Sequence, residues 1–203
     1  MVSLLHCRIL YVSLDYCSAT IESNSGGTLI PDMKKIILAT LLALLTGCLG
    51  MPDTVKPVNN FEIKRYLGKW YEIARLDHPF ERGLQQITAE YSLREGGGIN
   101  VKNRGYSTED GQWQEAEGKA FLVEDAATGY LKVSFFGPFY GSYVIFELDQ
   151  TNYQYAFVSG PDLTYLWLLA RTPDVAPELI DRFLSEAQKR GFDTNEIIYV
   201  EHE

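Results

Sequence analysis

Cysteine is scarce in this chain of 203 residues, which contains three. Two of them, Cys7 and Cys17, lie near the start, and the rest of the sequence contains only Cys48. From Cys48 onward an internal disulfide is therefore excluded, and packing alone must hold the fold together. His78 and His202 are the histidines of this part, so a metal site built from cysteine and histidine is excluded as well.

Basic clusters are also absent, and the one apolar run near the start is short. The formal net charge is −9, from 18 Lys and Arg against 27 Asp and Glu, with no run of Lys or Arg. A nucleic-acid partner would require a basic patch, so the composition argues against one. The apolar run 36–45 has about ten residues, whereas a membrane-spanning helix needs about 20.

The sequence patterns of common catalytic sites are missing too. The chain has no Gly-x-Ser-x-Gly elbow and no histidine beside a plausible nucleophile. His78 precedes Pro79 in a predicted loop, which favours a solvated residue over a catalytic base. The sequence therefore predicts a protein that is not an enzyme and that needs no cofactor and no metal ion. Loss of a chemical activity on His78→Ala would overturn this reading.

A pattern of a different kind precedes Cys48. Met33-Lys34-Lys35 is followed by the apolar run 36–45 and then by Thr46-Gly47-Cys48. A positive segment, an apolar segment and small residues before a cut form a secretory signal peptide. A cut directly before Cys48 resembles the lipobox of bacterial lipoproteins, which implies that Cys48 is lipidated and anchors the chain at a membrane surface. The alternative is a buried cysteine in a core helix.

These features divide the chain into four parts. Residues 1–32 have no clear periodicity and are interpreted as a non-native leader or a mis-assigned start, and 33–47 as the lipoprotein signal peptide. Residues 48–60 contain two prolines and are predicted to form an extended, lipidated tether. Residues 61–203 are long enough for one domain with its own core.

Short β-rich runs at regular spacing fill most of this domain. Turn residues separate them, as in Gly96-Gly97-Gly98 and Gly160-Pro161-Asp162. Strands are predicted at 70–76, 87–93, 99–106, 113–123, 130–136, 143–148, 153–159 and 165–171. About eight strands joined by hairpin-length turns are typical of an antiparallel sandwich or barrel.

One amphipathic helix is predicted after these strands. Pro177 suits its first turn, and Gly191 suits its C-terminal stop. Its apolar face must be buried against the outside of the sheet, and consists of Leu179, Ile180, Phe183, Leu184 and Ala187. A short final strand is predicted over 197–200.

Four features of this arrangement together resemble the lipocalins over roughly residues 61–200. They are Gly68-Lys69-Trp70 at the start of the first strand, Thr151-Asn152-Tyr153 in the turn before the seventh, Arg171 at the end of the eighth, and the single helix that follows. The resemblance implies an all-β fold, an eight-stranded antiparallel up-and-down barrel with one C-terminal α-helix packed outside.

Two longer stretches, 66–75 and 132–141, resemble the bacterial branch of the family, whose members are typically outer-membrane lipoproteins. One residue departs from the family pattern, since Asn152 stands where the family usually has Asp. Asn can make similar turn hydrogen bonds, so the resemblance holds.

Gly68, Trp70 and Arg171 are expected to close one end of the barrel. Gly68 allows a tight bend where the chain enters the floor, and Trp70 plugs that floor with a large apolar ring. Arg171 is expected to stack on Trp70 and to donate hydrogen bonds to main-chain carbonyls. These are structural roles in barrel closure.

Eight strands make a barrel wide enough for one small ligand, and the alternation of side chains predicts the inner face. Strand 113–123 is ambiguous, and its small face is placed inward because the other face would bury three charges at a cost of several kcal/mol. The predicted pocket residues are Ala89, Tyr91, Val101, Asn103, Gly118, Ala120, Val133, Phe135, Phe146, Tyr165, Trp167 and Leu169. Such an apolar cup suits an acyl chain, and the alternative is a filled core.

The choice for strand 143–148 depends on two acidic residues. Glu147 and Asp149 are expected to face water, because an unpaired charge is costly to bury. Alternation then turns the intervening positions of this strand inward, namely Val144, Phe146 and Leu148.

Several residues near the open end of the barrel have more than one reading. Glu72 shares the face of Trp70 and is expected to point inward, where it either binds a ligand head group or is hydrogen-bonded by a neighbour. The resemblance implies that loop 77–84 lies across the open end. Four apolar side chains there either touch a ligand or form a dimer surface: Phe80, Leu84, Phe139 and Tyr140.

The resemblance therefore implies a lipid-anchored outer-membrane lipocalin that binds, stores or transports fatty acids, lysophospholipids or similar small apolar ligands. Leu49 follows Cys48 where an Asp would signal inner-membrane retention, which implies the outer membrane, facing the periplasm. Affinity would come from acyl burial, at about 0.8 kcal/mol per methylene. The alternative is a lipid-anchored interaction module of the cell envelope without a physiological ligand. A homodimer, the natural ligand and the physiological role stay open.

Overall fold

The computed structural model describes residues 49–202. The predictions made for the leader, the signal peptide and Cys48 lie outside the described residues. Among residues 49–202, no helix is both long enough and apolar enough to cross a membrane.

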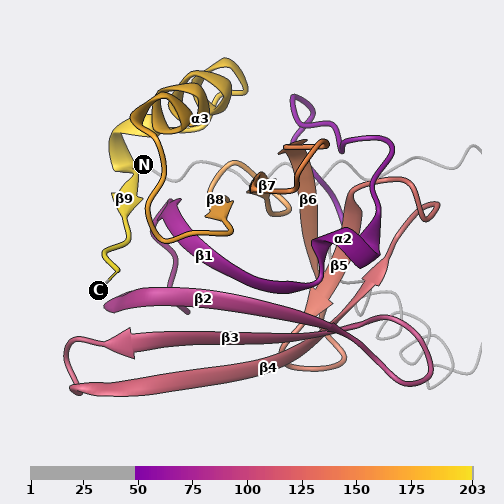
Figure 1. Ribbon diagram of the computed structural model, residues 1–203, viewed down its shortest axis with the longest axis horizontal. Helices are drawn as coiled ribbons and strands as arrows, with labels where there is room; N and C mark the ends of the chain where they lie inside the picture. The colour runs from indigo at the N-terminus through magenta and orange to yellow at the C-terminus, as the bar shows by residue number, and fades with distance from the viewer. Residues whose placement is uncertain (1–48, 203) are drawn as a thin grey trace, which may run out of the picture. The chain divides into compact units, whose positions relative to one another are not determined.

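The described residues form a β-rich domain with few helical turns (Figure 1). The helical segments are α2 (Ile63–Tyr66), α3 (Pro177–Lys189) and the short 3-10 helix η1 (Thr194–Glu196). The strands are β1 (Gly68–Arg75), β2 (Leu84–Leu93), β3 (Ile99–Ser107), β4 (Gln112–Leu122), β5 (Tyr130–Ser134), β6 (Gly141–Leu148), β7 (Tyr155–Ser159), β8 (Leu166–Ala170) and β9 (Ile198–Tyr199).

All strand pairs are antiparallel, and each strand from β2 to β7 pairs with the next strand along the chain. Strand β1 pairs with β8 on one side and with β2 on the other, so the sheet closes on itself. Near the end of β1, the short β9 replaces β2 as its neighbour. The predicted eight-stranded antiparallel up-and-down barrel is confirmed.

One end of this barrel is covered by α2 and is called the closed end here. The opposite end carries the loops 76–83, 108–111, 135–140 and 160–165, and is called the open end. Because β1 runs from the closed end to the open end, Trp70 lies near the floor and Arg75 near the mouth.

Helix α3 lies outside the barrel, as predicted, and buries its apolar face on β6, β7 and β8 (Figure 1). The ring centroids of Phe183 and Phe157 are 5.1 Å apart in an edge-to-face arrangement. The outward-facing side chains of β8, Leu166 and Leu168, are fully buried in the same cluster. The barrel wall therefore has two apolar sides, one packed under α3 and one facing the interior.

β-bulges interrupt the alternation of side chains at two places that matter for the interior. In β1 the register shifts between Glu72 and Ala74, and in β6 it shifts between Ile145 and Glu147. An extra residue at a bulge reverses the inward and outward sides of every later residue in the strand. The faces of β1 and β6 therefore change sides partway along each strand.

The segment before α2 differs from the extended tether predicted over 48–60. Val55 is buried in the cluster under α3, and the Val58 amide donates a hydrogen bond of 2.8 Å to the carbonyl of Ile145. Nearer its start, the Gly50 amide donates to Ser142 Oγ at 3.1 Å. The described part of this segment thus packs along β6, because its apolar residues find partners there. The two apolar clusters of the described residues are formed by the barrel, α3 and this segment together, and a domain needs such a core to fold by itself.

Candidate functional site: the barrel interior

The closed end of the barrel is sealed by Trp70 and Arg171. Trp70 is fully buried, and its indole N–H donates to the carbonyl of Tyr66 at 2.8 Å. The Arg171 guanidinium lies 3.9 Å from the centroid of the Trp70 ring. It donates to three main-chain carbonyls, those of Tyr153, Lys69 and Arg65, at 3.2, 2.8 and 2.8 Å. Every arm of this cation therefore has a partner.

Gly68 allows the backbone to bend where β1 begins at the closed end. Its φ is +91°, a conformation that side chains disfavour and glycine adopts readily. A Cβ at this position would also lie 3.5 Å from Arg171 Nη1, so the bend at Gly68 and the position of Arg171 are linked.

Above this floor lies a cavity of about 480 Å³, a size typical of small-molecule sites. Most of its wall is aliphatic or aromatic. Of the residues that the sequence placed in the pocket, the lining contains Ala89, Tyr91, Val101, Asn103, Ala120, Val133, Phe135, Tyr165, Trp167 and Leu169. The interior is thus an apolar cup with a few polar positions.

Phe146 lies elsewhere, and its assignment to the pocket is wrong. Its ring packs against Phe157 and Phe192 in the cluster under α3, and Val144 belongs to the same cluster. The bulge in β6 explains the error. The prediction assumes strict alternation along β6, with Glu147 facing outward. This assumption is correct for Leu148, which packs inside the barrel, but the bulge reverses the inward and outward sides of the residues before it.

Gly118 is hidden from the cavity by its neighbour Phe135. A Cβ at Gly118 would come within 2.8 Å of the Ser134 carbonyl oxygen and 2.9 Å of the Phe135 ring. The space that the sequence assigned to this position is therefore occupied by an aromatic side chain that itself lines the cup.

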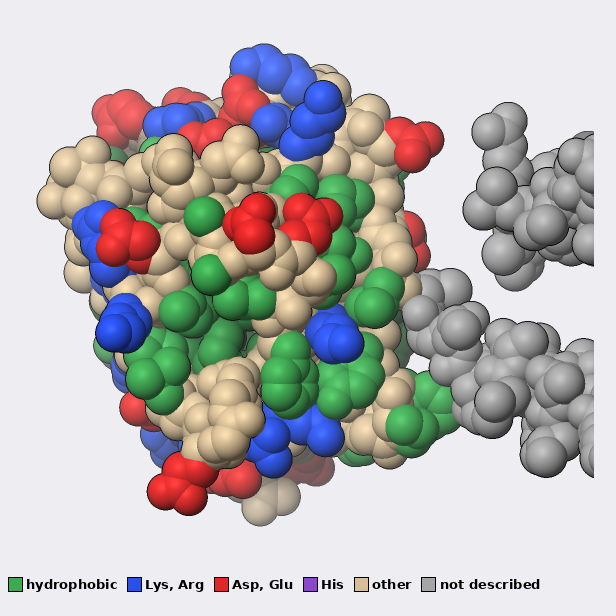
Figure 2. Space-filling model, turned by 90° about the vertical axis from the view of Figure 1, so that its right-hand side faces the viewer, with side chains coloured by type: hydrophobic (Ala, Val, Ile, Leu, Met, Phe, Trp, Pro, Cys, Tyr) green, Lys and Arg blue, Asp and Glu red, His purple; other side chains and the backbone are tan. Residues whose placement is uncertain are grey.

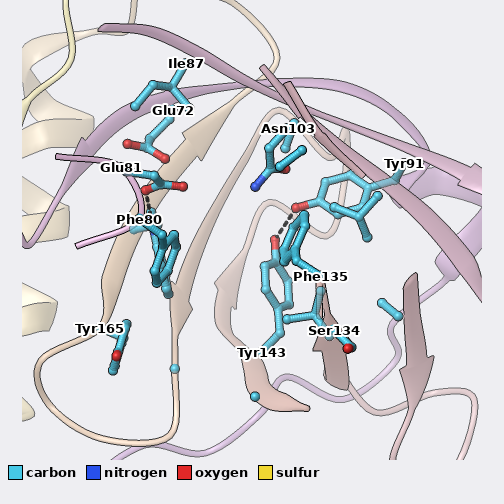
Figure 3. A pocket seen from close by; sticks show the side chains of 18 of the residues that line it. Glu72, Phe80, Glu81, Ile87, Tyr91, Asn103, Ser134, Phe135, Tyr143 and Tyr165 are labelled. Carbon is cyan, nitrogen blue, oxygen red and sulfur yellow. Dashed lines mark hydrogen bonds between the residues drawn. The ribbon is translucent and has the colours of Figure 1, made fainter. Parts of the chain in front are cut away.

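Tyr143 is an inner residue that the sequence reading placed outside. Its hydroxyl lies 2.9 Å from that of Tyr91 (Figure 3) and 2.7 Å from that of Tyr66, so the three phenols form a hydrogen-bonded chain. Burial raises the pKa of all three hydroxyls, which keeps them neutral. The chain adds a polar but uncharged strip to the lower wall of the cup.

A cluster of charged residues lies on the wall nearer the open end. Glu72, Arg75, His78 and Glu81 have exposed fractions of 4, 2, 2 and 6 %. The bulge in β1 turns both Ile73 and the next residue outward, and so brings Arg75 beside Glu72. Loop 76–83 folds back to add His78 and Glu81. Figure 3 shows the carboxyl groups of Glu72 and Glu81 next to each other, with Asn103 facing them across the cavity.

Within this cluster, Glu81 makes most of the hydrogen bonds and charged contacts. Its Oε2 accepts a hydrogen bond from the Trp167 indole at 3.2 Å and lies 2.9 Å from His78 Nε2. Arg75 Nη2 donates to the main-chain carbonyl of Glu81 at 2.9 Å, and Arg75 Nε lies 3.9 Å from Glu81 Oε2. Glu81 therefore fixes loop 76–83 against β1 and β8.

Glu72 has far fewer partners. Its Oε1 lies 3.5 Å from Arg75 Nη1, and neither atom makes a hydrogen bond within residues 49–202. Burial, followed by the negative charge of Glu81, raises the pKa of the Glu72 carboxyl well above its usual range. Both Glu72 and Glu81 line the cavity.

His78 corrects a further expectation, because it is a buried residue stacked 4.0 Å from the Phe80 ring and not a solvated one. The sequence reading weighed Glu72 but missed Arg75 and Glu81. The bulge in β1 could not be predicted, because polar and apolar residues alternate only weakly in this strand. The position of loop 76–83 could not be predicted either, because it depends on contacts with residues distant in the sequence. In the part of the chain that the structure describes, no group of three metal-ligating side chains converges.

The rim of the open end is apolar and exposed. Phe80, Phe136 and Phe139 have exposed fractions of 58, 80 and 64 %, and all three also line the cavity, as does Leu84. Tyr140 is not part of the lining, and has Lys119 and Lys132 near its ring. On another view of the barrel, Figure 2 shows hydrophobic side chains gathered across the middle of one face, with charged side chains among and around them.

A closed antiparallel barrel with an apolar cup, a tryptophan floor locked by an arginine and one external helix defines a lipocalin. The family model of the lipocalin-like domain matches residues 61–202. The chain therefore belongs to the lipocalin family, whose members are binding proteins and generally not enzymes.

Two bacterial relatives are similar over most of their length. The chain is 63 % identical over 171 residues to the outer membrane lipoprotein Blc of Vibrio cholerae, covering 84 % of this chain and 100 % of that protein. It is 49 % identical over 171 residues to the outer membrane lipoprotein Blc of Escherichia coli K12, covering 83 % and 96 %. These similarities assign the chain to the lipid-anchored lipocalins of the outer membrane.

A solved structure supports the fold independently. Insecticyanin from the tobacco hornworm Manduca sexta superposes with a TM-score of 0.61 at 24 % sequence identity, covering 75 % of this chain and 86 % of that chain. At this identity the likeness concerns the barrel architecture alone.

Proposed function

We propose that this barrel binds, stores or transports fatty acids, lysophospholipids or similar small apolar ligands in its cavity. The chain would be anchored through Cys48 at the outer membrane and would face the periplasm. The observation that carries the proposal is the cavity of about 480 Å³, lined mainly by aliphatic and aromatic side chains inside a closed barrel. Such a site gains affinity by removing an acyl chain from water, at about 0.8 kcal/mol per methylene.

The course of the N-terminal segment supports exchange of ligand with a membrane. Gly50 is hydrogen-bonded to Ser142 at the start of β6, which is the open end of the barrel. Cys48 precedes Gly50 by two residues, a reach of about 7 Å. The described part of the chain therefore begins beside the mouth, next to the loop that carries the exposed Phe136 and Phe139.

Titration of the chain from Leu49 onward with palmitic acid and with palmitoyl lysophospholipid, followed by tryptophan fluorescence, tests the proposal. Trp167 lines the cavity and is the expected reporter. Saturable quenching at one ligand per barrel, or per dimer, is expected. No response to any acyl ligand would overturn the proposal.

Filling the cavity supplies the matched variants. Ala120 and Ala116 both line the cup, with Ala120 deep in it and Ala116 nearer the mouth. Ala116→Phe is therefore the easier variant to accommodate, and serves if Ala120→Phe does not fold. Both are expected to weaken acyl binding by about tenfold or more, since each displaces several methylene groups. Ala126→Phe, in an exposed turn at the closed end, makes the same change away from the cavity and should bind as the parent does. Gly118→Phe is unsuitable, because the Phe135 ring already occupies its space.

The second candidate is an interaction module without a physiological ligand. The exposed rim residues Phe80, Phe136 and Phe139 favour it, because clustered exposed apolar side chains mark contact surfaces. A second copy of the chain would then cover them as a homodimer. Analytical ultracentrifugation of the parent and of Phe136→Ser, alongside a negative ligand titration, would identify this case.

A further inference from the structure

The most unusual group in the barrel interior is the carboxyl of Glu72. It is 4 % exposed, it lines the cavity, and its Oε1 lacks a hydrogen-bond partner within the described residues. Leaving a buried polar atom unpaired costs about 1–3 kcal/mol, and more for a charged group. Groups that remain unpaired in this way are concentrated where a ligand completes the set.

The neighbours of Glu72 in the described part of the chain leave its Oε1 without a hydrogen bond. Arg75 directs its donating Nη2 to the main chain of loop 76–83 and approaches Glu72 Oε1 only to 3.5 Å. His78 and Trp167 both serve Glu81. Among residues 49–202, Arg75 is thus the one permanently charged cation beside the two carboxyl groups, and Glu72, whose pKa is raised by burial and by the charge of Glu81, retains its proton more tightly. A cationic ligand would take the place of that proton.

The space in front of Glu72 is the cavity itself. In Figure 3 the carboxyl groups of Glu72 and Glu81 project from one wall, and the amide of Asn103 faces them from the opposite wall. An amide both donates and accepts, so Asn103 can hold the rest of a polar head group. Below this level the wall consists largely of side chains such as Ala89, Val101 and Leu131.

We propose that Glu72 and Glu81 form a subsite for the head of an amphiphile whose polar end donates hydrogen bonds, and that a protonated primary amine suits it best. This inference rests on the proposed binding function and specifies its ligand class. An ammonium group supplies three donors and a positive charge that pairs with the two carboxyl groups, and its alkyl chain would extend into the apolar cup. A hydroxyl supplies one donor and no charge. A carboxylate supplies only acceptors and a further negative charge beside Glu81, so the subsite disfavours it.

Three probes with the same saturated sixteen-carbon chain separate these cases: hexadecylamine, hexadecanol and palmitic acid. Dissociation constants are measured on the chain from Leu49 onward at neutral pH and below micelle formation. The salt concentration is kept high, because the net charge of −9 attracts any cation to the surface and salt screens that attraction. The expected order is amine tightest, alcohol next and acid weakest, with amine and acid about tenfold or more apart, the effect of one charge-assisted hydrogen bond.

Two substitutions of the same kind locate the effect. Glu72→Gln keeps the shape and removes the charge, and is expected to weaken amine binding by about tenfold while leaving the alcohol within about threefold. Glu117→Gln makes the same change at an exposed position of the same sheet, on β4, that does not line the cavity. It should leave the order of the three probes unchanged.

The outcomes distinguish this inference from the proposed function. Binding of all three probes with equal affinity, or an order that survives Glu72→Gln, would overturn the subsite and leave the lipid-binding function standing. Failure of every probe to bind would overturn the proposed function itself. The order of affinities in the parent protein tests the subsite even if Glu72→Gln does not fold.

Discussion

Two arginines at opposite ends of the barrel illustrate how one fold uses the same side chain in two ways. At the closed end, Arg171 covers the Trp70 ring and donates to three main-chain carbonyls. At the open end, Arg75 is 2 % exposed, yet its Nε and Nη1 have no hydrogen-bond partner in the described part of the chain. The first arrangement is complete and stabilises the barrel, whereas the second is incomplete, and its two carboxyl groups, those of Glu72 and Glu81, line the cavity.

The difference follows from what surrounds each cation. Main-chain carbonyls are neutral acceptors held by the strands themselves, so Arg171 gains hydrogen bonds without burying a second charge. Arg75 instead meets two carboxyl groups, and burying both of them as carboxylates beside one guanidinium is costly, so Glu72 retains its proton more tightly. Breaking the closed end should therefore cost stability, and neutralising the open end should increase it.

The largest expected effect is at the closed end. Trp70→Ala should lower the free energy of unfolding by about 3–5 kcal/mol, because it leaves a cavity under the floor of the barrel. Urea denaturation followed by circular dichroism measures it. Trp113→Ala removes the same side chain from an exposed position beside Arg104, and should cost about 1 kcal/mol or less. Equal losses would show that Trp70 does not seal the barrel.

Removing the cation that covers Trp70 comes next. Arg171→Met should lower the free energy of unfolding by about 2 kcal/mol, because three carbonyls lose a charged donor. The control is Arg182→Met, since Arg182 pairs with Glu147 on the surface, where such pairs contribute about 0–1 kcal/mol. The comparison of the two ends would fail if Arg171→Met were as mild as its control.

The open end should respond in the opposite direction. Burial and the charge of Glu81 raise the pKa of Glu72, so the folded state holds its proton more tightly than the unfolded state. The stability from this group is complete below the ordinary carboxyl pKa and is lost as the pH rises through the raised value. Glu72→Gln should therefore stabilise the barrel by about 1 kcal/mol at neutral or higher pH, the cost of one unsatisfied buried group.

Denaturation at a series of pH values checks the sign of this effect. The gain from Glu72→Gln should vanish toward acidic pH, where Glu72 is already protonated in both states. A variant that is less stable than the parent at neutral pH would mean that the carboxylate is satisfied in solution.

The smallest effect is expected for a carboxylate that has its full set of partners. Hydrogen bonds from Lys189 and Arg190 lower the pKa of Glu186 on α3 to about 2. Its contribution is present above the ordinary carboxyl pKa and is lost as the pH falls toward about 2, the reverse of Glu72. Glu186→Gln should cost about 0.5 kcal/mol at neutral pH, as for a surface ion pair. NMR titration of the two carboxyls would establish the opposite shifts.

Much of the fold could be predicted from local patterns. Turn residues such as Gly96-Gly97-Gly98 and period-two alternation located eight strands, and Pro177 and Gly191 bounded the single external helix. Strands that pair with their sequence neighbours need few long-range decisions, so a correct list of strands nearly determines an up-and-down barrel. The confirmed architecture reflects this simplicity.

The interior was harder to predict, because inward and outward positions depend on an uninterrupted register. The bulge in β6 reversed the faces of Val144 and Phe146, and Tyr143 moved inward in their place. The predicted space at Gly118 proved to be filled by Phe135. Such errors arise where one extra residue in a strand reverses all the positions beyond it.

The sequence by itself determined the class of the protein, since strand spacing, the Gly68-Lys69-Trp70 motif and Arg171 are local patterns that each predict a part of the closed barrel. Only the tertiary structure decided that Glu72, Arg75, His78 and Glu81 meet at the cavity wall. A bulge in β1 and the return of loop 76–83 bring them together. Both are consequences of packing between distant segments, which no local pattern in the chain specifies.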